Sequence, residues 1–158
     1  MNEKKQIIII LLLSTVLGIT RYILIEDPDF TLIKKERVIA KVDSFIIPDD
    51  IAGPMVVDLE FSKYYFDHNS AIFIDARDPE DYNIAHIKNS INIPYDYFED
   101  YEDVIDSLDE SAVYIIYCSG GECSLSIDLA DYLYNEKLFD QVLVFEGGWP
   151  EWEEAGYP

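Results

Sequence analysis

An apolar run that ends in a cysteine constrains the fold of this chain more than any other segment. Residues 114–117 read Tyr-Ile-Ile-Tyr, and Cys118 follows them directly. A short run of strand-forming residues predicts a buried β-strand, which would deliver the cysteine to its carboxyl end. Gly120 and Gly121 then let the backbone turn sharply without a Cβ penalty.

The residues after this loop predict a helix. Leucines recur every fourth position from Leu125 to Leu133, which is helical spacing. The loop would therefore lie at a helix N-terminus, where unpaired amides and the helix dipole favour an anion. A thiolate is such an anion, and its pKa falls in this position. Cys118 is thus either a reactive sulfur or a buried cysteine with ordinary packing, and the loop favours the reactive sulfur.

Strand and helix patterns alternate along the rest of the chain. Strands are predicted at residues 37–42, 71–74, 91–94, 112–117 and 142–145, and helices at residues 57–66, 96–108 and 124–134 and from Asp78 onward. This alternation predicts an α/β fold with a parallel sheet.

In such a sheet, ligands bind beyond the carboxyl ends of the strands. The segments predicted to meet there are Asp75–Arg77, the Cys118 loop and Gly147-Gly148-Trp149. Each also has a structural interpretation: an ion pair or cap for Asp75 and Arg77, a turn with positive φ for the glycines, and a core position for Trp149. His86 is either a base or, as its apolar neighbours favour, a hydrogen-bonded structural histidine.

The N-terminal segment predicts a membrane anchor. Residues 7–25 are apolar or small except for Arg21 and Tyr22, and Lys4 and Lys5 precede them. Such a helix would be about 28 Å long, against a hydrocarbon core of about 30 Å. A cleaved signal peptide is the alternative, but the sequence shows no pair of small residues typical of a cleavage site. Residues 1–25 are therefore predicted as tail and transmembrane signal anchor, residues 26–53 as linker and possible first strand, and residues 54–158 as the domain.

The side of the membrane is predicted from flanking basic residues. Lys4 and Lys5 favour a cytoplasmic N-terminus and an exported domain, periplasmic or extracellular. Arg21 and the basic residues at 34–37 favour the opposite orientation. We expect the exported side, since a short tail before an apolar anchor is the usual layout for export.

Charge and cysteine content exclude several classes of function. The net charge is −21, and residues 38–158 carry 27 acidic and five basic residues. Such a domain repels nucleic acid, so we expect no nucleic-acid partner. Two cysteines are too few for a zinc site or a disulfide framework. We expect no metal and no cofactor.

The motifs together resemble the single-domain rhodanese-like family over residues 54–158. The segments that carry the resemblance are Asp75-Ala76-Arg77, His86-Ile87, Asn92-Ile93-Pro94, Tyr117-Cys118 with its loop, and Phe145-Glu146-Gly147-Gly148-Trp149. The resemblance implies a sheet with helices on both faces, and Cys118 as a nucleophile that bears a persulfide. It implies an active-site loop of Ser119, Gly120, Gly121, Glu122, Cys123 and Ser124. Asp75, Arg77, His86, Gly147, Gly148 and Trp149 would support this loop.

The loop departs from the family pattern in its charge. Members that use thiosulfate often carry Arg or Lys in the loop, commonly at its sixth position, whereas this chain has Cys123 there and Glu122 beside it. Ala85 also replaces the glycine that usually precedes the histidine. A dianionic donor would meet like charges, so the site is predicted not to be optimised for thiosulfate. A phosphatase role is disfavoured because Ser124 stands where such an enzyme needs arginine.

The leading hypothesis is a membrane-anchored sulfurtransferase that takes sulfur from a small donor and passes it to a thiol acceptor. In this hypothesis, Cys123 is the candidate resolving thiol, which would leave a disulfide with Cys118. One alternative is a non-catalytic module that docks a partner protein at the membrane. The other is a Cys118/Cys123 dithiol redox protein.

Overall fold

The computed structural model of the protein describes residues 3–24, 45–48, 52–121 and 123–158. The chain divides into two compact units, Met1–Val38 and Ile39–Pro158. The strand predicted at residues 37–42 lies outside the described residues, as does most of the predicted linker.

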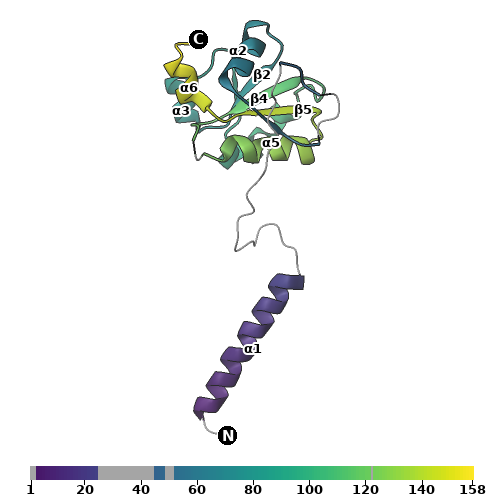
Figure 1. The fold of residues 1–158 in the computed structure, drawn as a ribbon, viewed down its shortest axis with the longest axis vertical. Helices are drawn as coiled ribbons and strands as arrows, with labels where there is room; N and C mark the ends of the chain where they lie inside the picture. Colours follow the sequence, from purple (N-terminus) through teal and green to yellow (C-terminus); the bar gives the residue numbers. More distant parts are fainter. Residues whose placement is uncertain (1–2, 25–44, 49–51, 122) are drawn as a thin grey trace. The chain divides into compact units, whose positions relative to one another are not determined.

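The first unit contains one described helix, α1, Glu3–Leu24 (Figure 1). Its apolar side chains include Ile7, Ile10 and Leu11, and all three are exposed. In the part of the chain that the structure describes, no helix is long and apolar enough to cross a membrane. The transmembrane span predicted at residues 7–25 is therefore not supported.

The second unit is built on a parallel five-stranded sheet in the order β1-β5-β4-β2-β3. Its strands are β1 Met55–Val57, β2 Ile72–Asp75, β3 Ile91–Asn92, β4 Val113–Tyr117 and β5 Gln141–Phe145. The central strand β4 is buried from Tyr114 to Tyr117, since β2 and β5 pair with its two edges and helices cover both faces. This confirms the predicted α/β fold with a parallel sheet.

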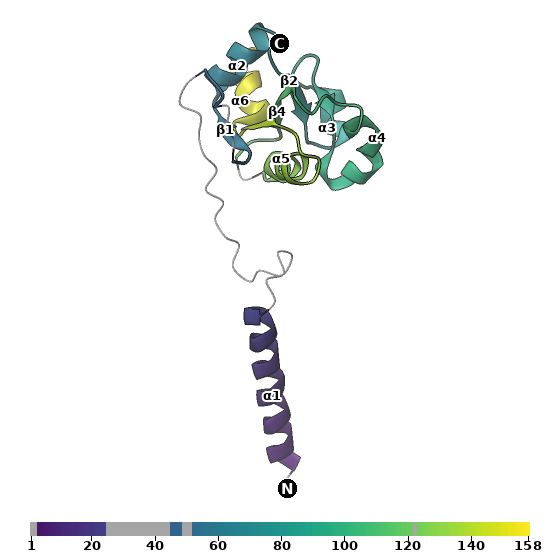
Figure 2. The same ribbon diagram turned by 90° about the vertical axis from the view of Figure 1, so that its right-hand side faces the viewer.

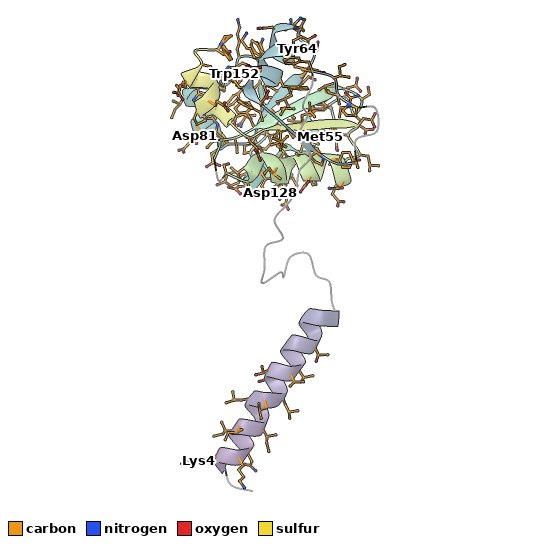
Figure 3. The ribbon with its side chains drawn as sticks, in the orientation of Figure 1. Lys4, Met55, Tyr64, Asp81, Asp128 and Trp152 are labelled. Carbon is orange, nitrogen blue, oxygen red and sulfur yellow. The ribbon has the colours of Figure 1, made fainter. Side chains whose placement is uncertain are left out.

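Helices lie on both faces of the sheet (Figure 2). They are α2 Leu59–Asp67, α3 Pro79–Ile84, the 3₁₀ helix η2 Tyr95–Tyr101, α4 Glu102–Ile105, α5 Leu125–Asn135 and α6 Gly148–Glu154. On one face, Leu129 and Leu133 of α5 pack with Ile116 of β4. On the other, Phe61 of α2 and Trp152 of α6 pack with Ile115. Figure 3 labels Asp128 on α5 and Trp152 on α6, which lie on opposite sides of the sheet.

Two sequence predictions of secondary structure are wrong. Val57 belongs to the edge strand β1 rather than to a helix, because residues 55–57 pair in parallel with residues 143–145 of β5. The single helix predicted at residues 96–108 is divided into η2 and α4, and Tyr97 has a non-helical backbone.

A buried tyrosine fixes the carboxyl end of β4. The hydroxyl of Tyr117 accepts a hydrogen bond of 3.0 Å from the Ile87 amide and is hydrogen-bonded to the Ser90 hydroxyl, also at 3.0 Å. Burial, and then the charge of Asp75, raise the pKa of Tyr117, so the phenol stays neutral. These bonds tie the strand end that precedes Cys118 to the segment between α3 and β3.

Candidate functional site

The sheet register brings the predicted segments to one edge. Asp75 of β2 lies beside Tyr117 of β4, which lies beside Phe145 of β5. Because all three strands are parallel, the residues that follow them leave the sheet at the same edge. The structure therefore places Arg77, the Cys118 loop and Gly147 in one region.

Cys118 sits directly after β4 and is 2% exposed. Its Sγ lies 3.3 Å from the Oγ of Ser126, within hydrogen-bonding distance, and it donates to the Cys123 carbonyl at 3.6 Å. Ser126 is itself buried in the first turn of α5. Ser126 was not among the site residues predicted from the sequence, although it is only the second residue of the helix that follows the loop.

The loop after Cys118 turns back on itself. Gly120 and Gly121 have φ angles of +71° and +62°, in the left-handed region that favours glycine. The Cys123 amide then donates to the Gly120 carbonyl at 3.2 Å. Glu122, which the sequence analysis assigned to this loop, lies outside the described residues.

The surroundings of Cys123 change the pKa of its thiol. Burial, and then the neighbouring Cys118 thiol, raise the pKa of Cys123, and the Leu125 and Ser119 amides oppose this rise. Both cysteines are free thiols. The structure therefore holds two sulfur atoms together at the N-terminus of α5.

The α5 helix begins at Leu125, and its N-cap residue Ser124 makes no side-chain capping bond. An uncapped helix N-terminus leaves backbone amides available to an anion. The predicted position of the loop, before a helix and after a strand, is the position that the structure shows.

The turn between β5 and α6 supports the loop from outside. The Trp149 amide donates to the Cys118 carbonyl at 2.9 Å. Gly148 has a φ angle of +61°, and a Cβ there would lie 2.3 Å from the Cys118 carbonyl oxygen and 2.6 Å from the Gly120 nitrogen. Only glycine allows this approach, because real Cβ contacts are essentially never that short. Of the two glycines predicted to need positive φ, only Gly148 adopts it, since Gly147 has a φ angle of −60°.

Asp75 and Arg77 form a buried ion pair. The guanidinium binds the Asp75 carboxylate through Nε at 3.0 Å and Nη2 at 2.6 Å, and Nη2 also donates to the Ala85 carbonyl at 2.8 Å. Burial lowers the pKa of Arg77, but the hydrogen bond and charge of Asp75 outweigh it and hold that pKa above its ordinary value. The guanidinium lies 5.6 Å from the centroid of the Trp149 ring. These contacts agree with the structural role that the sequence analysis favoured.

His86 also makes local contacts. Its Nδ1 is 2.8 Å from the Tyr82 carbonyl oxygen, and its ring stacks on the Tyr82 ring with centroids 3.9 Å apart. These bonds fit the hydrogen-bonded structural histidine rather than a base. Within the described ranges, the structure contains no group of three or more His, Cys, Asp or Glu residues that could hold a metal.

Comparison with known families matches residues 60–155 to the rhodanese-like domain. Among solved structures, a protein from Bacillus halodurans is similar, with 25% identity, a TM-score of 0.55, and coverage of 63% of this chain and 72% of that one. The rhodanese-like domain of an Anabaena protein has 25% identity and a TM-score of 0.52, with coverage of 64% and 74%. A thiosulfate sulfurtransferase from Pseudomonas aeruginosa shares the fold at 23% identity and a TM-score of 0.54, over 67% of this chain and 20% of that one.

We predict that Gly148→Ala damages the site far more than Gly121→Ala. Both glycines have positive φ, but a Cβ at Gly121 meets nothing within 4 Å, whereas one at Gly148 meets the Cys118 loop. Gly121→Ala should cost only the left-handed strain, about 1–2 kcal/mol of unfolding free energy. Gly148→Ala should cost at least about 2 kcal/mol more, because backbone must move. Urea unfolding measures both losses.

The same two variants also distinguish a local change in the Cys118 loop from a loss of overall stability. Displacement of the loop in Gly148→Ala should expose Cys118 and speed its alkylation, while Gly121→Ala should leave the alkylation rate near that of the wild type. Equal losses of stability in the two variants would show that the close approach at Gly148 does not constrain the loop.

Proposed function

Because the chain belongs to the rhodanese-like family, we propose that it is a sulfurtransferase that carries sulfane sulfur as a persulfide on Cys118. The observation that supports this most is the placement of Cys118. The thiol ends the central strand, precedes the N-terminus of α5, and lies 3.3 Å from the Ser126 hydroxyl. A hydroxyl and helix amides near a sulfur favour its thiolate form.

The reaction follows from this arrangement in two displacements. In the first, the Cys118 thiolate attacks the sulfane sulfur of a donor, the donor S–S bond breaks, and the donor leaves as its own anion. The product is a persulfide on Cys118. In the second, an acceptor thiolate attacks the outer sulfur, which restores the Cys118 thiolate. The Ser126 hydroxyl stabilises this thiolate before the first step and after the second, as hydrogen bonds to charged groups do.

Burial and charge favour a small donor with little charge. Cys118 is 2% exposed, so a low-molecular-weight persulfide or polysulfide reaches it more readily than a folded protein does. Residues 38–158 carry 27 acidic and five basic residues, which repel a dianion such as thiosulfate.

One experiment distinguishes this proposal from the two alternatives that the sequence suggests. A docking module predicts no sulfur on the protein after exposure to a donor, and a simple dithiol redox protein predicts a disulfide without any persulfide. Mass spectrometry of the intact chain separates them from a sulfurtransferase, which gains one sulfur atom on Cys118.

The proposal predicts that Cys118→Ser abolishes sulfur transfer to a thiol acceptor and that Ser126→Ala slows it. Loss of one hydrogen bond to a thiolate should cost about 1.5–3 kcal/mol, or about 10- to 100-fold in rate at pH 7. Ser70→Ala is the control, because it removes a serine hydroxyl at an exposed residue outside the loop. Undiminished transfer by Cys118→Ser would refute the proposed function.

Donor preference gives a second prediction. Glu122→Arg should raise thiosulfate turnover by about 10- to 100-fold, because it replaces a repulsive charge in the loop with an attractive one. Turnover with a low-molecular-weight persulfide should change less. Glu136→Arg, the same charge change at an exposed residue just beyond the far end of α5, is the matched control. Equal gains from both variants would assign the effect to net charge alone.

We further propose that α1 attaches the chain to a membrane, with the domain on the exported side. The support is the apolar run from the sequence and the exposure of its side chains, such as Leu17 at 69%. Transfer of such side chains from water into an apolar environment lowers the free energy. Carbonate extraction of the full chain is the test, and we expect it to stay in the membrane pellet. Release into the supernatant, or loss of the first 25 or so residues, would contradict attachment.

A further inference from the structure

The two cysteines of the loop lie next to each other. The Cys118 Sγ lies 3.6 Å from the Cys123 carbonyl oxygen, and Cys123 packs against the core cluster that contains Cys118. The turn from Gly120 to Cys123, closed by a 3.2 Å hydrogen bond, is what returns the second cysteine to the first. A disulfide requires two cysteines whose Cα atoms lie within about 7 Å of each other, and this turn brings the Cys123 backbone against the Cys118 sulfur.

The surroundings of the two thiols differ. Cys118 is buried, whereas Cys123 is half-buried and therefore open to solvent. Burial raises the pKa of Cys123, and the Ser119 and Leu125 amides oppose that rise. A thiolate formed at Cys123 would lie beside Cys118 with these two amides to stabilise it. The loop thus places a second nucleophile against the first one.

We propose that Cys123 resolves the persulfide on Cys118 and makes the protein a sulfide-releasing persulfide reductase. This inference rests on the proposed function, since it needs sulfur on Cys118. The Cys123 thiolate attacks the inner sulfur, which is the Cys118 Sγ. The bond between Cys118 and Cys123 forms, the bond between the inner and outer sulfur breaks, and the outer sulfur leaves as hydrosulfide.

Attack on the inner sulfur is supported by the leaving group. Hydrosulfide is a weaker base than an alkyl thiolate, and in thiol–disulfide exchange the weaker base leaves faster. Attack on the outer sulfur would expel the Cys118 thiolate instead and would move the sulfur to Cys123. The two routes therefore give different products on the protein.

The cycle balances with one donor and one external reductant. A low-molecular-weight persulfide loads Cys118 and leaves as its thiol. Resolution releases one hydrogen sulfide and leaves the Cys118–Cys123 disulfide. A dithiol reductant, of the chemical class of dithiothreitol or a dithiol protein, then reduces this disulfide by exchange and is itself oxidised. The sum is reduction of a persulfide to a thiol and hydrogen sulfide.

The test uses the full chain, reduced and freed of reductant, and a low-molecular-weight persulfide as the probe. Intact-mass spectrometry and a sulfide assay follow the wild type, Cys123→Ser and Cys118→Ser over time. The wild type should gain one sulfur atom transiently, then lose it together with two hydrogens while an equal amount of sulfide appears. Cys123→Ser should gain one sulfur atom and keep it after the wild type has lost it. Cys118→Ser should form no disulfide.

The outcomes separate this inference from the proposed function. A wild type that keeps its extra sulfur as long as Cys123→Ser does would overturn the resolving role and leave the persulfide on Cys118 intact. Sulfur found on Cys123 in the wild type would equally overturn it. No sulfur on Cys123→Ser would refute the proposed function itself. Ser70→Ala, at an exposed residue outside the loop, should follow the wild type, and the wild-type time course alone decides the matter if a cysteine variant fails to fold.

Discussion

The close approach of two loops at the carboxyl edge of the sheet determines the shape of the site. Gly148 lies so near the Cys118 carbonyl and Gly120 that it leaves no room for a Cβ, and the Trp149 amide bonds the same carbonyl. The backbone that carries the thiol is therefore held by residues 147–149. Directly before the thiol, Tyr117 is bonded to Ile87 and Ser90. A loop fixed by both sets of contacts presents its amides in one arrangement.

Among the described residues, backbone amides and a hydroxyl are the polar groups beside the two cysteines. The Ser119 and Leu125 amides oppose the rise in the pKa of Cys123, and the Ser126 hydroxyl lies 3.3 Å from the Cys118 Sγ. Arg77 is near Trp149, but its guanidinium is bound to Asp75 and to the Ala85 carbonyl. Amides compensate one negative charge on a sulfur well and a dianion poorly, which is the physical basis of the donor preference proposed above.

The sequence predicted the parts of the fold that depend on local pattern. The strands at β2, β4 and β5 are apolar runs of strand length, and the helix at α5 has clear spacing, so local pattern and tertiary structure agree. Strand β1 has three residues, too few for any periodicity, and forms because β5 pairs with it. The break at Tyr97 likewise has no local signal, since the helical spacing of residues 96–108 continues through it.

In the site, too, the features that depend on local sequence could be predicted, and those that depend on tertiary contacts could not. Cys118 and the glycines could be predicted because a strand, a thiol and a turn follow one another in the sequence. The role of Gly148 in the contact with Cys118 could not, because the two residues are brought together by strand pairing. The contact of the Cys118 sulfur with the Cys123 backbone depends on how the turn at Gly120 closes, and sequence spacing does not determine that geometry.

Strand order in the sheet also determines when, during synthesis, each strand can find its partner. The first strand of the sheet, β1, pairs with β5, which is the last strand to be made. Cys118 leaves the ribosome before β5 and before Gly148, the residue that its loop packs against. Until β5 and Gly148 have been made, the loop carries its two thiols without the contact from Gly148, and β1 has no partner strand. Oxidants and chaperones would therefore meet these thiols during translation in a form quite different from the one in the finished protein.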